Sequence, residues 1–200
     1  MASSATPYGL KPVKRADGLP YAGAVTHYKI DPAGVANNIF YGSIVQLTAA
    51  GYVELADGTG KDLTTNNFGG SGIGAAGVFV GCEYVDSTGQ TQHSQYYPSG
   101  ALNAVAYIVD DPNVLFQAQL DGASSQADVG TVTGFAAAQN ATTSGNTATG
   151  NSTMAIDATV QTTAGGLLIM GFVSATSDAY PDVLVKFTTG AHRVTMSTGV

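Results

Sequence analysis

Hydrophobic and polar residues alternate most clearly in the stretch VLFQAQLD, residues 114–121. Alternation with a period of two is typical of a strand with one buried face. The predicted apolar face carries Val114, Phe116, Ala118 and Leu120, and the opposite face carries Leu115, Gln117, Gln119 and Asp121. The preceding stretch ALNAVAYIVD, residues 101–110, predicts a second strand, and the two meet at an Asp-Asp-Pro-Asn corner.

Similar segments recur along the chain between Gly, Pro, Asn and Asp turn signals. We predict further strands at 25–30, 39–48, 52–56, 78–86, 154–162, 166–175 and 182–189, and a hairpin-like excursion at 87–100. No helical crossovers separate these segments, which favours antiparallel over parallel pairing. Roughly nine or ten short strands predict a mainly β fold, an antiparallel β-sandwich or barrel with long loops.

The first 24 residues show no clear periodicity, so we predict an extended N-terminal arm at 1–24 and a single β-rich domain at 25–200. Prolines oppose regular strand pairing, and this segment contains Pro7, Pro12 and Pro20. It also holds three of the seven basic residues, Lys11, Lys14 and Arg15. The arm is either a solvated tail or a segment that lies on an acidic neighbour.

A long loop rich in Gly, Thr and Asn is predicted near residues 124–154, where the chain carries no charge after Asp128. The whole chain is weakly charged, with 10% Asp, Glu, Lys and Arg against an average of about 25%. A weakly charged surface is suited to burial against partner subunits, since the cores of protein interfaces are depleted in charge. A weakly charged soluble β protein explains the same composition equally well.

The formal net charge of −7 argues against general nucleic-acid binding, which needs a basic face. No apolar run approaches about 18 residues, so no membrane-spanning segment is predicted. The single cysteine, Cys82, lies in the strand-like run VFVGCEYV, where a lone cysteine is usually a small buried hydrophobe. The Gly-rich stretch 66–77 leads into a strand, whereas a phosphate loop leads into a helix, which favours a flexible connection or a close backbone approach to a neighbour.

No catalytic or metal-binding motif stands out. The histidines His27, His93 and His192 lack metal-ligand spacing. Asp110 and Asp111 could be a glycosidase pair or Ca²⁺ ligands, but neighbouring strand residues point to opposite faces, which favours turn capping. We therefore predict neither an enzyme nor a cofactor or metal site. In the excursion 87–100, Tyr96 and Tyr97 are either a contact surface or local packing.

Three groups of motifs follow one another along the chain: the opening PYGLKPVKR, GLPYAGAVTHYKI and NIFYGSIVQL, the middle YIVDDPNVLFQAQLD followed by ADVG, and the ending DVLVKFTTGAHR. In these motifs and their order, the chain resembles virion structural proteins of tailed bacteriophages, of the capsid decoration or cement type. The resemblance spans most of the chain, although residues 136–153 are not covered. The motifs are structural rather than catalytic.

This resemblance implies a homotrimer that binds the assembled major capsid protein on the outer surface of the virion, after synthesis in the host cytoplasm. It places the β core on the shell and an arm with Tyr8, Lys11, Lys14 and Arg15 over capsid subunits. Tyr96 and Tyr97 are the remaining candidate contact residues. No direct contact with nucleic acid or membrane is expected.

Two alternatives to a decoration protein remain open. The chain could instead be another virion component, of the tail, neck or head fibre, or a virion-associated enzyme or glycan-binding module. The last class needs polar residues that converge in a pocket, and no sequence motif indicates such a convergence.

Overall fold

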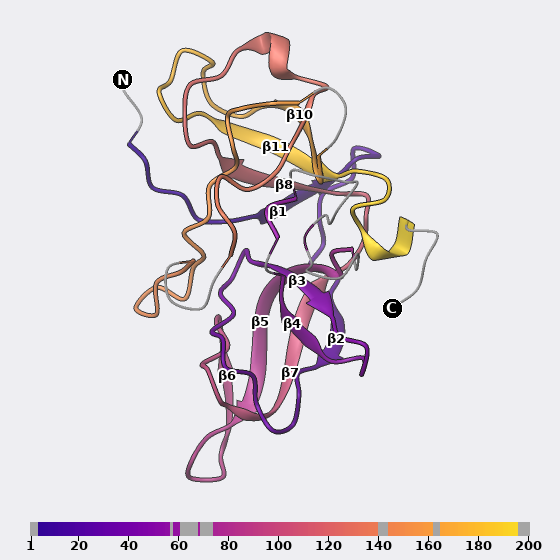
Figure 1. Cartoon of the computed structure of the whole chain (residues 1–200), viewed down its shortest axis with the longest axis vertical. Coiled ribbons are helices and arrows are strands. Elements are labelled where there is room, and N and C mark those ends of the chain that lie inside the picture. The colour runs from indigo at the N-terminus through magenta and orange to yellow at the C-terminus, as the bar shows by residue number, and fades with distance from the viewer. Residues whose placement is uncertain are drawn as a thin grey trace.

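The structure is a computed structural model that describes residues 4–56, 58–60, 68, 74–139, 144–161 and 165–195. Within these residues the fold is mainly β, with 41% strand and 3% helix, which confirms the predicted fold class. The strands form two antiparallel sheets that are not closed into a barrel, an arrangement consistent with a sandwich. Figure 1 shows one sheet above the other.

The first sheet combines the N-terminal segment with the second half of the chain. Its strand order among the described residues is β1-β8-β11-β10-β9. The bounds are β1 Lys11–Arg15, β8 Val114–Gln119, β11 Asp182–Phe187, β10 Leu167–Phe172 and β9 Val132–Thr133. The 3-10 helix η1, Gln126–Asp128, precedes β9, and η2, Arg193–Thr195, follows β11.

The second sheet is built from consecutive segments of the first half of the chain. Its order is β2-β7-β5-β3-β4 in the described part, and β6 pairs with β5. The bounds are β2 Thr26–Lys29, β7 Leu102–Val109, β5 Gly77–Val85, β3 Ile44–Leu47, β4 Val53–Leu55 and β6 Thr91–Ser94. The chain passes from the second sheet to the first at the corner between β7 and β8.

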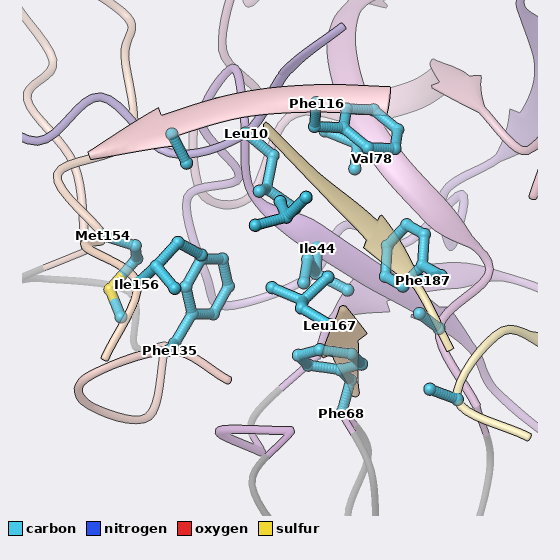
Figure 2. Packing of buried hydrophobic residues seen from close by; sticks show 14 of the residues in the cluster. Leu10, Ile44, Phe68, Val78, Phe116, Phe135, Met154, Ile156, Leu167 and Phe187 are labelled. Atoms are coloured by element: carbon cyan, nitrogen blue, oxygen red, sulfur yellow. The ribbon is translucent and has the colours of Figure 1, made fainter. Parts of the chain in front are cut away.

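A hydrophobic core joins the two sheets and contains residues from both (Figure 2). Phe187 of β11 makes edge-to-face contacts with Phe68 and Phe116, with ring centroids 5.8 Å apart in each case. Ile44 and Val78 reach this core from the second sheet. A second cluster of buried side chains, which includes Phe79, Ile108 and Tyr97, is formed by the second sheet and the segments next to it.

The structure differs from the expectation for the N-terminal arm. Residues 11–15 form β1, which pairs with β8, and Leu10 is completely buried in the core between the sheets. Pro12 is tolerated because β1 is the end strand of its sheet, and the register shifts between Pro12 and Lys14. Part of the predicted arm is therefore integral to the sheet.

The strand predicted at 154–162 is wrong. Its described residues, 154–161, make only isolated bridges, from Ile156 to Leu120 and Phe135 and from Gln161 to Val132. Asp157 accepts a hydrogen bond from the backbone N–H of Thr159 (2.8 Å), a local turn that interrupts extended pairing. The long loop near 124–154 contains η1 and β9, and residues 140–143 lie outside the described part.

Candidate functional site

The main pocket lies where the N-terminal segment crosses the outer face of the first sheet. Its volume is about 470 Å³, and its lining comprises Tyr8, Lys11, Tyr41, Gln95, Gln117, Asn151 and Asp182. Lys11 and Gln117 are direct cross-strand partners on β1 and β8. Phe116 and Ala118 point into the core, so the alternation of β8 turns Gln117 outward. The outer face of the first sheet therefore forms the floor of the pocket.

Tyr8 reaches this pocket because the chain on either side of it is fixed. The backbone N–H of Leu10 donates to Gly42 O (2.9 Å), and the N–H of Gly9 donates to Met154 O (3.2 Å). Gly9 has a φ of +74°, and a Cβ at this position would lie only 2.6 Å from Gly42 O. Glycine at position 9 thus lets Leu10 enter the core while Tyr8 faces the pocket.

Tyr8 and Asp182 are the polar centre of the pocket. Gln117 Nε2 donates to Asp182 Oδ2 (3.0 Å), whereas Asp182 Oδ1 and Tyr8 Oη are both buried and have no hydrogen-bond partner among the described residues. Burial, followed by the negative charge of Asp182, raises the pKa of the Tyr8 phenol, which keeps this group protonated. Both atoms are shielded from solvent, so they shape the pocket but are not presented to a ligand in it.

The opposite wall comes from three other segments. Tyr41 and Asn151 form an isolated parallel bridge, and Gln95 Nε2 donates to Asn151 Oδ1 (2.6 Å). Tyr41 and Gln95 also line a shallower hollow of about 440 Å³ on the second sheet, together with His93 and Tyr107. The pocket and the hollow therefore adjoin each other, with Tyr41 and Gln95 lining both.

The structure separates the basic residues predicted to contact a partner. Lys11 lines the pocket, and Lys14 is exposed on β1. Arg15 is engaged within the chain: its Nη1 donates to Asp111 Oδ2 (2.6 Å) and its Nε donates to Asp17 Oδ2 (3.1 Å). Lys11 and Lys14 are therefore better placed than Arg15 to meet a partner.

The two adjacent tyrosines have different environments. Tyr96 is half-buried and stacks on Phe40 with a centroid distance of 5.7 Å. Tyr97 is fully buried; its Oη donates to Ala101 O (2.8 Å) and accepts from the N–H of Val35 (3.1 Å). The prediction that Tyr97 contacts a partner is wrong for this structure, because its ring and hydroxyl are used to close the 97–101 loop.

The acidic corner has a structural role. Asp111 Oδ1 accepts from the N–H of Asn113 (2.8 Å), which confirms the predicted turn cap. Asp110 accepts from Thr26 Oγ1 (2.9 Å) and Tyr28 Oη (3.0 Å). The two carboxylates therefore bind different parts of the chain and do not converge on a shared ligand.

Cys82 and His192 are both buried. Burial raises the pKa of the Cys82 thiol to about 12 and lowers the pKa of His192 to about 4. The described residues contain no group of three or more His, Cys, Asp or Glu side chains able to hold a metal ion. In the same part of the chain, no helix is both long and apolar enough to span a membrane.

Comparison with known proteins identifies no relative: no family model, no curated protein and no solved structure matches this chain. The sequence indicated Tyr8 and Lys11 but missed Tyr41, Gln95, Gln117, Asn151 and Asp182. The alternation in residues 114–121 placed Gln117 on the polar face, which was the only available signal. The other four belong to segments that meet only through the fold.

Proposed function

We propose that this chain is a capsid decoration (cement) protein of a tailed bacteriophage, which binds the assembled major capsid protein as a homotrimer on the outer surface. The motif resemblance at the opening, middle and end of the chain supports this proposal. The acidic net charge of −7 is in keeping with an outward position, because packaged DNA repels an acidic surface.

One structural observation carries the proposal. The chain after β1 folds back on that strand, with Tyr21 N–H donating to Val13 O (3.3 Å) and Arg15 N–H donating to Leu19 O (2.8 Å). Within the described chain, residues 13–25 expose three large apolar side chains, Val13 (39%), Leu19 (60%) and Val25 (38%). We call residues 13–25 the exposed hairpin. Exposed apolar side chains that lie this close in sequence, with exposed Lys14 among them, suit a protein contact.

The proposed mechanism is mass action. A protein that binds only the assembled shell stabilises that shell over free subunits. A trimer that contacts several capsid subunits at once gains avidity, which compensates for weak individual contacts. Stabilisation of this kind requires no chemical step.

The proposal is tested by sedimentation of the purified chain with shells that lack it and, separately, with unassembled capsid protein. We expect binding to shells only. Leu19→Asp on the exposed hairpin should weaken binding roughly tenfold or more, since it places a charge in the contact. Val173→Asp is a matched control, because Val173 is also exposed (50%) but lies after β10. Equal weakening by both variants, or equal binding to free subunits, would contradict the proposal.

A further inference from the structure

The outer face of the first sheet carries positive charge, although the chain as a whole is acidic. The residues on either side of Lys186 in β11 point into the core, so Lys186 points outward. Lys11 on β1 is the cross-strand partner of outward-facing Gln117, which places Lys11 on the same face. Lys14, within the exposed hairpin, lies at the margin of this face.

Apolar side chains lie between these lysines. Leu184 is the cross-strand partner of Gln117, and Leu168 on β10 is the partner of Lys186. Both leucines are half-buried, so part of each is open to a contact. Asp182 is the only acidic residue in the described strands of this sheet; one of its oxygens accepts from Gln117 and the other is shielded from solvent. We call Lys11, Leu168, Leu184 and Lys186 the basic face.

Negative charge gathers in the second sheet. The described residues between positions 26 and 109 include four acidic side chains and one lysine. One of the four, Asp86, begins the β5–β6 connection, which lies away from the first sheet (Figure 1). Its carboxylate accepts hydrogen bonds from Thr88 Oγ1 (2.6 Å) and Gln92 Nε2 (2.8 Å), which lower its pKa and keep it charged.

A groove at this end of the second sheet adds apolar surface. Its volume is about 320 Å³, and it is lined by residues 84–87 and 98–102. Leu102 in this lining is 49% exposed. The chain just after the turn at Asp31 accepts a hydrogen bond from Gly100 N–H (2.9 Å), which holds this second carboxylate at the same end. We call Asp31, Asp86 and Leu102 the acidic end.

The two surfaces belong to different sheets, so they match each other only between two copies of the chain. Two basic faces would repel each other, and so would two acidic ends, which opposes a two-fold contact of either surface with itself. A contact between two different surfaces is heterologous, and when it closes it forms a ring rather than a dimer.

We propose that the basic face of one copy docks on the acidic end of the next copy, so that the copies associate head to tail. Leu168 and Leu184 cover Leu102 and its groove, and the lysines face the carboxylates of Asp31 and Asp86. This arrangement has the apolar centre and polar rim of a protein interface. The inference identifies the contact surfaces of the homotrimer in the proposed function and rests on that part of it.

The test is sedimentation velocity of the full chain, without shells, at roughly 1–200 μM in about 20 mM and about 500 mM NaCl. We expect association beyond a dimer at low salt. High salt should raise the dissociation constant, because it screens the charges at the contact.

Charge substitutions locate the contact. Lys186→Glu on the basic face and Leu102→Lys at the acidic end should each raise the dissociation constant roughly tenfold or more, since each brings like charges together. The double variant should recover much of this loss, because the two introduced charges are opposite and adjacent. Lys29→Glu is the matched control: it changes the net charge as Lys186→Glu does, at an exposed position of β2, and should not weaken association.

The proposal is overturned if the unaltered chain stays monomeric or stops at a dimer, or if Lys186→Glu weakens association no more than Lys29→Glu does. Binding of polyglutamate to a chain that stays monomeric would assign the basic face to an acidic partner instead. Shell binding is measured separately with the exposed hairpin variant Leu19→Asp, so the inference can fail while the capsid proposal stands.

Discussion

Asp110 and Asp111 are consecutive in the chain, yet their carboxylates bind different sheets. Asp110 accepts hydrogen bonds from Thr26 and Tyr28 on β2 of the second sheet. Asp111 accepts a hydrogen bond from Arg15 on β1 of the first sheet. The corner between β7 and β8 is therefore tied to both sheets at the point where the chain passes between them.

The tie through Asp111 gives the first prediction. Asp111→Ala should lower the free energy of unfolding by about 1–2 kcal/mol, because it removes both the turn cap and the partly exposed ion pair with Arg15. Asp111→Asn retains an acceptor for the N–H of Asn113 and should cost about 0.5–1 kcal/mol. Urea denaturation measures both values. An equal loss for the two variants would show that the turn cap contributes nothing.

The neighbouring tyrosines provide a second, internally controlled prediction. Tyr97→Phe should lower the free energy of unfolding by about 1–3 kcal/mol, because it leaves the backbone groups of Val35 and Ala101 without their buried partner. Tyr96→Phe keeps the stacking on Phe40 and should change it by less than about 0.5 kcal/mol. Thermal and urea unfolding of the two variants test this difference. A larger loss of stability in Tyr96→Phe than in Tyr97→Phe would contradict the environments assigned to the two side chains.

His192 gives a prediction about pH. Burial lowers its pKa in the folded chain to about 4, whereas an unfolded histidine titrates near 6.5. Below about pH 6.5 the unfolded chain takes up a proton that the folded chain does not, so stability falls as pH decreases from about 6.5 to 4. The full effect is about 3 kcal/mol, because one pKa unit corresponds to about 1.4 kcal/mol.

Urea denaturation at a series of pH values measures this effect. His192→Gln should flatten the slope between about pH 6.5 and 4, whatever its stability at neutral pH. An unchanged slope in His192→Gln would mean that His192 is not the group responsible.

The two leucines of the N-terminal region test how firmly this region belongs to the fold. Leu10→Ala should lower the free energy of unfolding by about 2–4 kcal/mol, because Leu10 is completely buried in the core between the sheets. Leu19→Ala should change it by less than about 0.5 kcal/mol, since Leu19 is 60% exposed. Equal small effects would indicate that residues 1–24 behave as a separate arm.

The sequence predicted the sheets better than the N-terminal region. The alternation in residues 114–121 correctly placed Phe116 inward and Gln117 outward, because both faces of β8 have distinct environments. β1 was missed because Pro12 and its basic neighbours are unusual in a strand and are tolerated only at a sheet edge. The segment 154–162 has the composition of a strand, but its apolar residues enter the core from a loop.

The candidate site was predictable only in part. Tyr8 and Lys11 stood out by their chemistry, but Asp182 faces Tyr8 only because β11 pairs with β8 and the N-terminal segment crosses that sheet. Tyr96 and Tyr97 have the same side-chain type, so no local pattern could show which one turns into the core. The pairing of strands over the whole chain determines which side chains meet and which are buried. No short sequence pattern specifies that pairing.

The copy number of this chain per virus particle is the most direct test of the proposed function, measured by quantitative gel densitometry against the major capsid protein. A decoration protein that occupies the three-fold positions as a trimer predicts roughly one copy per capsid subunit. A count of roughly a dozen copies or fewer would contradict a cement role and move the chain to the neck, the tail or a single vertex.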